Sequence, residues 1–188
     1  MDYATAARIA EKLCKRLEPA CEQIQIAGGI RRRKAQPHDV ELVAIAKIVP
    51  IYDLYGHETG ERNLLDEALE GLVDNGTLKR GAKQGPRYKQ FVVLPEGVML
   101  DLFIVRYPAQ WGVIYTIRTG PARYSHWLVT QQAKGGALPD DAYVQDGAVW
   151  YDNQPLPMPT EESFLAFLGI PVPNPAEREP RWRQRKES

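Results

Sequence analysis

Two acidic side chains, Asp39 and Glu41, are separated by one residue at the start of an apolar segment. Side chains alternate along a β-strand, so both carboxylates should share one face while Val40 and Leu42 lie on the other. Carboxylates this close repel each other unless something offsets their charge. A divalent cation would do so, because Mg²⁺ prefers carboxylates together with substrate phosphate oxygens. The alternative is a solvated acidic pair on an edge strand.

A third acid, Asp101, is the only charged residue in the apolar segment 98–105. An unpaired carboxylate in a buried strand is costly, so we expect Asp101 to have either a cation or a basic side chain as its partner. A structural salt bridge to an arginine is the alternative to catalysis here. If this strand packs beside the Asp39 strand, three carboxylates converge, and three acids around Mg²⁺ form a centre for phosphoryl transfer.

Glycines and arginines precede the acidic pair. Gly28 and Gly29 would let backbone amides approach a ligand closely, and amides at a helix start attract anions. Arg31 and Arg32 would add charge-assisted contacts to a triphosphate. A strand-to-helix turn beside a solvated basic cluster is the alternative. Further basic clusters at 79–89 and 178–186 could follow phosphates, or be solvated surface and a disordered tail.

The spacing of apolar residues predicts the elements that position these side chains. Pro95-Glu96-Gly97 separates two of the predicted strands, which should form a hairpin. Turn residues mark most of the other boundaries. The pattern predicts helices at 5–17, 63–74, 109–117, 122–134 and 161–168. It predicts strands at 40–48, 88–94 and 98–105, a short buried strand at 24–27, and short strands within 142–151.

Composition narrows the class of protein. The chain has 188 residues, of which 44% are hydrophobic and 26% charged, so it should fold. Its net charge of zero weighs against a protein that coats nucleic acid. We expect no membrane span and no secretion signal. Cys14 and Cys21 form no CxxC pair, so we expect no zinc site. We expect both to be free thiols in a reducing cytoplasmic location, which would be the host cytoplasm if the chain is virus-encoded, and a disulfide between them is the minor alternative.

These motifs resemble the signature of the DNA polymerase beta superfamily of nucleotidyltransferases: Gly-Gly, a spacer, Asp-x-Glu and a later strand acid. The resemblance is closer to family X DNA polymerases and covers most of the chain. Residues 28–33 are similar to the family's Gly-Ser-aromatic-Arg-Arg-Gly segment, and residues 117–121 are similar to Tyr-Phe-Thr-Gly-Ser. Residues 164–178 resemble the family's C-terminus.

The resemblance implies an α+β fold. Residues 1–107 would form a palm domain with a mixed sheet and helices on one face. Residues 108–173 would form a small α/β C-terminal subdomain that binds the nucleotide, and residues 174–188 a flexible basic tail. The lyase domain and DNA-binding subdomain of larger members have no counterpart in this pattern.

The resemblance also implies residue roles. Asp39 and Glu41 would ligate two Mg²⁺ ions, for which Mn²⁺ can substitute. Asp101 would ligate the catalytic ion and help activate a primer 3′ hydroxyl for in-line attack on the α phosphate. Arg87 and Lys89 would lie along a nucleic-acid strand. The nucleotide would be bound by Gly28, Gly29, Arg31, Arg32, Thr119, Gly120, Pro121 and Ser125.

Several positions depart from the family pattern. Glu41 replaces the usual Asp, Gly29 replaces Ser, and Ser125 stands where the family has Asn. An aromatic pair is absent at 117–118, so rNTP use is plausible beside dNTP use. The family has a cis peptide bond in this turn, and Gly120-Pro121 could adopt one at low cost.

The leading hypothesis is a monomeric DNA polymerase acting on primer-template or gapped DNA, in repair or replication. It should be distributive and sensitive to salt. The second hypothesis keeps the chemistry but makes addition independent of a template, or uses an RNA, protein or small-molecule acceptor. The third is a nucleic-acid binding module without catalysis.

Overall fold

A computed structural model of the chain describes residues 1–180. The chain divides into two compact units, the first formed by residues 1–26 and 36–104 and the second by residues 27–35 and the chain from 105 onward. The division lies close to the expected boundary at 107. However, the segment 27–35, expected in the palm domain, groups with the second unit.

The first unit is built on a five-stranded mixed sheet. Its strand order is β1-β2-β7-β6-β5, with β2 and β7 parallel and every other neighbouring pair antiparallel. The predicted hairpin is confirmed, since β6 pairs with β7 across the turn at 94–97. The strands are β1 Cys21–Ile26, β2 Asp39–Ala46, β5 Leu78–Gln84, β6 Tyr88–Val93 and β7 Val98–Ile104.

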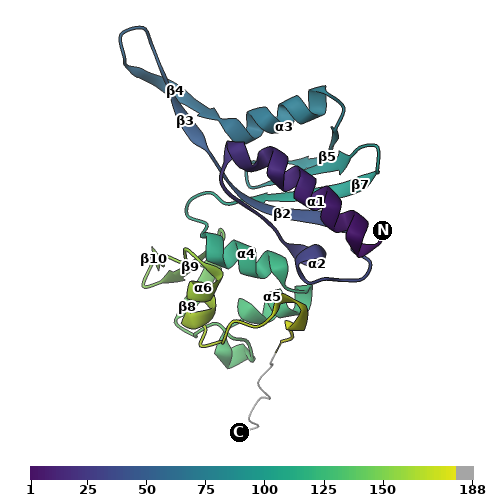
Figure 1. Cartoon of the computed structure of the whole chain (residues 1–188). Helices are drawn as coiled ribbons and strands as arrows, with labels where there is room; N and C mark the ends of the chain where they lie inside the picture. The colour runs from purple at the N-terminus through teal and green to yellow at the C-terminus, as the bar shows by residue number, and fades with distance from the viewer. Residues whose placement is uncertain (181–188) are drawn as a thin grey trace. The chain divides into compact units, whose positions relative to one another are not determined.

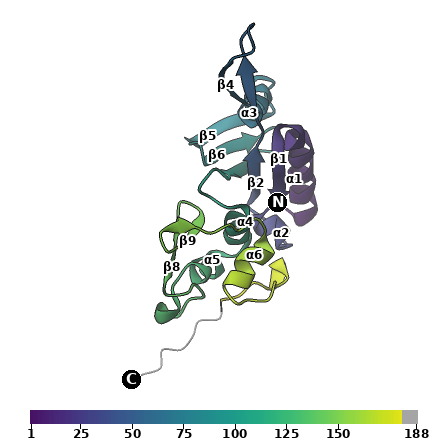
Figure 2. The ribbon, with the colours of Figure 1, turned by 90° about the vertical axis from the view of Figure 1, so that its left-hand side faces the viewer.

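Two helices, α1 (Tyr3–Leu17) and α3 (Leu64–Asp74), cover one face of this sheet (Figures 1 and 2). A short 3₁₀ turn, Glu18–Ala20, joins α1 to β1. Apolar residues at helical spacing pack against alternate residues of the strands, as the sequence pattern predicts. Within the described first unit, no helix lies on the opposite face. The buried residues are Ile9, Leu13, Leu17, Leu65, Leu69 and Leu72 from the helices and Val40, Leu42, Phe91, Leu100 and Leu102 from the strands.

A separate two-stranded hairpin was not predicted. β3 (Ile48–Tyr52) and β4 (Glu58–Asn63) are antiparallel and project beyond the sheet between β2 and α3 (Figures 1 and 2). Most of their side chains are exposed, so no buried face imposes the apolar alternation by which a strand is recognised. For the same reason β5, which is polar and largely exposed, was not predicted.

The second unit combines short helices with a small sheet of order β10-β9-β8, so the chain is α+β as expected. The predicted helix 122–134 is shorter in the structure: α5 ends at Leu128, and a 3₁₀ turn, Gln132–Lys134, follows. The elements are α2 Gly28–Arg31, α4 Trp111–Thr119, α5 Ala122–Leu128, β8 Ala142–Gln145, β9 Ala148–Tyr151, β10 Gln154–Pro155 and α6 Glu161–Phe167. Their shared core includes Val113, Tyr124, Trp127, Leu128, Val149, Phe164 and Leu165.

The expected flexible tail begins with packed residues. A 3₁₀ turn, Pro175–Glu177, precedes Arg178, whose side chain is fully buried. Glu179 pairs with Arg123. Residues 181–188, with the rest of the expected basic tail, lie outside the described residues.

Other expectations concern covalent and backbone details. Cys14 and Cys21 are both free thiols, and burial raises the pKa of Cys14 to about 12 and that of Cys21 to about 11. Cis peptide bonds occur at Leu94-Pro95 and Tyr107-Pro108, whereas the bond before Pro121 is trans. Across residues 1–180, none of the helices combines the length and apolar character needed to cross a bilayer.

Candidate active site

Three carboxylates lie on the helix-free face of the first unit's sheet. Asp39 and Glu41 alternate with buried Val40 and Leu42, which face α1 and α3. The parallel register of β2 and β7 puts Glu41 opposite Asp101 and Asp39 opposite Met99. Residues opposite each other on neighbouring strands point to the same face, with the strands about 4.8 Å apart. The expected convergence of Asp39, Glu41 and Asp101 on one face is therefore present at the level of the backbone.

Asp101 is held by two neutral donors from β6. Its Oδ1 accepts a hydrogen bond of 2.7 Å from the Tyr88 hydroxyl and one of 3.1 Å from Nε2 of Gln90. Gln90 lies opposite Asp101 in the antiparallel register, and the Tyr88 ring stacks on Phe103 with centroids 5.0 Å apart. We expected a cation or a basic side chain, but no ion pair of Asp101 occurs within residues 1–180. These donors orient the carboxylate without neutralising its charge.

Oxygen atoms remain available on this face. Within the described part of the chain, no protein donor reaches Oδ2 of Asp101, and the Asp39 side chain makes no hydrogen bond or ion pair. Hard carboxylate oxygens of this kind suit Mg²⁺ or Mn²⁺ rather than zinc. In the same described residues, no three His, Cys, Asp or Glu side chains are already gathered into a metal-binding group.

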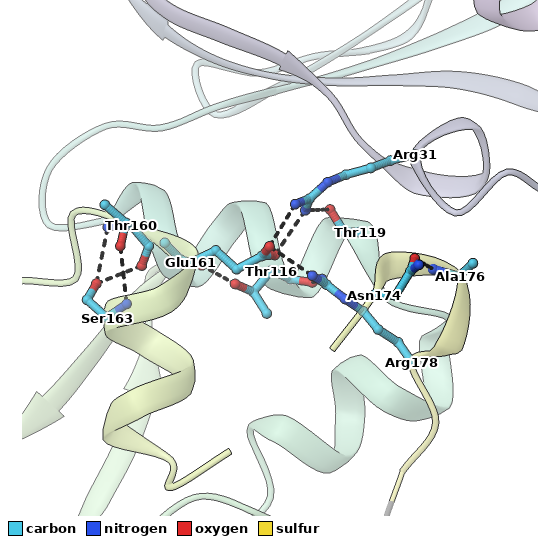
Figure 3. Close-up of polar contacts among 10 residues, drawn as sticks. Arg31, Thr116, Thr119, Thr160, Glu161, Ser163, Asn174, Ala176 and Arg178 are labelled. Carbon is cyan, nitrogen blue, oxygen red and sulfur yellow. Dashed lines mark hydrogen bonds and ion pairs between the residues drawn. The ribbon is translucent and has the colours of Figure 1, made fainter. Parts of the chain in front are cut away.

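In the second unit, the Arg31 side chain points toward Glu161 and Thr119 (Figure 3). Its guanidinium donates two hydrogen bonds to the Glu161 carboxylate, of 2.9 and 2.7 Å, and one of 2.7 Å to the Thr119 hydroxyl. It also lies 4.0 Å from the centre of the Tyr115 ring. Arg178 approaches the same carboxylate, with its Nη2 2.8 Å from Oε2 of Glu161. Arg31 thus has a structural role in this unit. The sequence had instead indicated that it contacts a triphosphate.

The Glu161 carboxylate is buried but charged. Burial acts to raise its pKa, but hydrogen bonds from Arg31 and the positive charges of Arg178 and Arg31 outweigh burial, so the pKa lies below the usual value. Arg178 also approaches the main-chain oxygen of Thr116. The cluster ties together α2, α4, α6 and the chain at residue 178 (Figure 3).

The other residues expected at the nucleotide also contact the protein. Arg32 donates a hydrogen bond of 2.5 Å to the carbonyl of Thr119, which is fully buried. The Ser125 hydroxyl donates to the carbonyl of Ile117 at 2.5 Å, near the end of α4, so its hydrogen is used by the backbone. Gly120 ends α4, Pro121 precedes α5, and Gly28 begins α2 with a φ of +60°. Gly29 is buried inside α2.

Arg87 and Lys89, both expected along a nucleic-acid strand, lie in different environments. Arg87 is exposed just before β6. Lys89 points to the opposite face from Tyr88 and Gln90, and its ammonium lies 3.3 Å from Oδ1 of Asp66 in α3. Lys89 therefore has a partner inside the protein, and its expected contact with nucleic acid stays a prediction.

Sequence reasoning missed Tyr88, Gln90 and Glu161. Counting outward from the expected turn at 95–97 would have paired Phe91 with Asp101, whereas the turn in the structure, 94–97, pairs Gln90 with Asp101. Tyr88 then follows two residues away on the same face. No local signal pairs Glu161 with Arg31, because 130 residues separate them in the chain.

Comparison of the sequence with protein-family models and with curated proteins found no match. The chemistry of the carboxylates and their surroundings is therefore the basis on which a function can be inferred.

Proposed function

We propose that this chain is a metal-dependent nucleotidyltransferase, and specifically a DNA polymerase of minimal family X type. It would add dNTPs to a primer 3′ hydroxyl and release pyrophosphate. The observation that carries the proposal is the shared, helix-free sheet face of Asp39, Glu41 and Asp101, with Glu41 directly beside Asp101 in parallel register. The resemblance of the surrounding motifs to family X polymerases supports the same reaction.

The carboxylates fit the metal that this reaction requires. Asp39, Glu41 and Asp101 would hold two Mg²⁺ ions, with Mn²⁺ as a substitute. When bound, such ions neutralise phosphate charge and make a hydroxyl a better nucleophile. Tyr88 and Gln90 hold Oδ1 of Asp101, so Oδ2 would be the oxygen that binds a metal ion. The 3′ oxygen would bond to the α phosphorus as the bond to the leaving pyrophosphate oxygen breaks.

Residues of the second unit would bind the nucleotide. The backbone amides of Gly28 and Gly29 and the guanidinium of Arg32 suit the β and γ phosphates. Arg31 supports that segment through Glu161 and Thr119 rather than by contact with the nucleotide. Exposed Arg87 would lie along the nucleic acid.

A second candidate keeps the reaction and changes the acceptor. The Asp-x-Glu motif and the net charge of zero keep this possibility open. The chain would then act without a template, use rNTPs, or modify RNA, a protein or a small hydroxyl compound.

Extension of a labelled primer on gapped DNA, with Mg²⁺ and each dNTP supplied separately, tests the proposal. Asp101→Asn keeps the size and the hydrogen bonds of the side chain but removes its charge. We expect it to lose about 1,000-fold in extension rate, since a metal contributes several kcal/mol to the transition state. Asp74→Asn, at an exposed position of α3, is the matched control and should leave the rate unchanged.

The outcomes separate the candidates. Templated addition that is lost only in Asp101→Asn supports a DNA polymerase. Addition that ignores the template, or that prefers rNTPs, favours the second candidate. If neither Mg²⁺ nor Mn²⁺ supports addition to any acceptor, and the nucleotide does not bind, both candidates are wrong.

A further inference from the structure

The tip of the β3–β4 hairpin exposes a cluster of large apolar side chains. Leu54 is fully exposed, Tyr55 is 86% exposed and Tyr52 is 59% exposed, and Ile51 lies beside them on β3. A single exposed apolar residue needs no explanation, but a contiguous group on a projecting element marks an interaction surface. These residues contribute nothing to the carboxylate face of the proposed active site.

The tip is held in shape before any partner binds. The Asp53 carboxylate accepts hydrogen bonds from the backbone N–H groups of Tyr55, at 2.8 Å, and His57, at 2.9 Å. The N–H of Asp53 also donates to the carbonyl of His57 at 2.9 Å. An ordered loop loses less conformational entropy on docking than a disordered one. The tip is therefore suited to insertion as a preformed unit.

A groove elsewhere on the first unit has the matching character. It has a volume of about 130 Å³ and lies where α1, the end of α3 and the β6–β7 turn meet. A cavity of roughly 150 Å³ accommodates a benzene ring, so this groove can take one large apolar side chain. Its rim carries Lys12, Arg16 and Glu96. Its apolar lining is formed by Ile9, Leu13, Leu72, Val93 and Leu94.

The charges around the tip and the groove are complementary. The hairpin carries three acids, Asp53, Glu58 and Glu61. Its basic residues are His57, whose Nδ1 lies 3.2 Å from Oδ2 of Asp53, and Arg62, which is paired with Glu67 at 2.5 Å. On the groove rim, Lys12 and Arg16 are exposed and make no ion pair within residues 1–180. Opposite charges around an apolar contact favour the correct partner and accelerate encounter.

The hairpin of one chain does not fill the groove of the same chain, since none of the residues that line the groove belongs to the hairpin. The parallel register runs from Asp39 opposite Met99 to Ala44 opposite Ile104. The hairpin follows the end of β2, whereas the groove is lined by residues that flank the turn before the start of β7.

We propose that the hairpin tip of one copy of this chain docks in the α1–α3 groove of a second copy. Leu54 or Tyr55 enters the groove, and the acidic flank of the hairpin faces Lys12 and Arg16. The contact is head to tail, so an open chain of molecules keeps one free tip at one end and one free groove at the other. The proposal is independent of the proposed catalysis. It replaces the expectation, from sequence, of a monomer.

A nucleic-acid partner for the tip is less favoured by the charges. Exposed aromatic residues can stack on bases, but the net negative charge of the hairpin would be repelled by phosphates.

Sedimentation velocity over a range of protein concentrations tests the proposal. The average mass of the wild-type chain should rise with concentration. Leu54→Asp on the tip and Leu94→Asp on the groove, both at exposed positions, should each weaken self-association by at least about 30-fold, as loss of a central interface residue does. Val172→Asp, an exposed apolar position in the second unit, is the control and should behave as the wild type. Circular dichroism checks that all variants fold.

Mixing the two variants gives the sharper result. The Leu94→Asp chain retains an intact tip and the Leu54→Asp chain an intact groove, so an equal mixture should form dimers but nothing larger. The proposal is overturned if the wild type stays monomeric at every concentration, or if the mixture does not associate. It is also overturned if Leu54→Asp leaves the mass unchanged but weakens binding of primer-template DNA, which would assign the tip to nucleic acid.

Discussion

The donors on Asp101 give this carboxylate an unusual environment for a lone acid in an apolar strand. A basic partner would have neutralised the carboxylate and competed with a cation for it. Tyr88 and Gln90 instead direct one oxygen and leave the charge in place. Tyr88 is itself held by its stack on Phe103. We therefore regard Tyr88 as a positioning residue for the proposed metal site.

Tyr88→Phe should separate positioning from packing. The substitution keeps the ring and its stack on Phe103 but removes the 2.7 Å hydrogen bond to Asp101. Loss of such a supporting contact typically costs 10- to 100-fold in metal affinity or activity. We expect a loss of about that size in primer extension, with part of it recovered at higher Mg²⁺.

A Mg²⁺ titration of the extension rate provides the measurement. Tyr107→Phe, at an exposed position, is the control and should leave the titration unchanged. An unaltered Mg²⁺ dependence in Tyr88→Phe, with thermal stability also unaltered, would show that Asp101 needs no support from this hydroxyl.

At the scale of elements, α4 packs against the chain before α6 at a glycine. The N–H of Gly112 donates to the carbonyl of Met158 at 2.9 Å. A Cβ atom at this position would lie 1.9 Å from the Thr160 carbonyl oxygen, a distance that no side chain can occupy. The close approach of these segments therefore depends on the absence of a side chain at residue 112.

Gly112→Ala should destabilise the protein although alanine favours a helix. The clash with backbone atoms cannot be relieved by a rotamer change, and overpacking of this kind costs about 1–3 kcal/mol. Gly71→Ala in α3 is the matched control, because a Cβ there meets nothing within 4 Å. That substitution should stabilise by about 0.5–1 kcal/mol. Urea unfolding measures both, and equal effects of the same sign would contradict the close packing of α4.

At the scale of the whole molecule, one carboxylate links distant parts of the chain. Glu161 binds Arg31 and Arg178, and Arg31 also binds Thr119, so the segment 27–35 is attached to the second unit through side chains. Arg178 is fully buried, so its charge depends on Glu161 for compensation. The division of the chain into units thus has an electrostatic cause as well as a packing one.

Glu161→Gln should destabilise the second unit severely. It keeps the shape of the side chain but leaves two arginines, one of them buried, without a countercharge. Removing one partner of a buried pair typically costs about 3–5 kcal/mol. Glu162→Gln, at the next and exposed position of α6, should change the stability little. Unfolding followed by tryptophan fluorescence provides the comparison, and equal stabilities of the two variants would contradict this role of Glu161.

The same carboxylate makes stability depend on pH. The pKa of Glu161 is lowered in the folded protein from its ordinary value of 4.5, so the folded state binds this proton less readily than the unfolded state. The contribution is therefore complete above about pH 4.5 and is lost as the pH falls through the lower folded value. Between pH 7 and pH 4, the wild type should lose more stability than Glu161→Gln.

The sequence by itself determined the elements that have a buried face. Apolar periodicity is a local property, so it indicated α1, α3, β2, the β6–β7 hairpin and α6 within a few residues. The alternation of side chains along a strand also determined that Asp39 and Glu41 share a face. Elements without a buried face, the β3–β4 hairpin and β5, left no such pattern and were missed.

Only the tertiary structure decided which distant residues meet. The parallel pairing of β2 with β7 brings Asp101 beside Glu41. From the sequence, this proximity followed only if the two strands were neighbours in the sheet. Residues 27–35 group with the second unit, where Arg31 binds Glu161 and Thr119. Neutral donors hold Asp101 because strand register places Gln90 opposite it. Such contacts join segments through space, and the periodicity of any one segment contains no information about its partner.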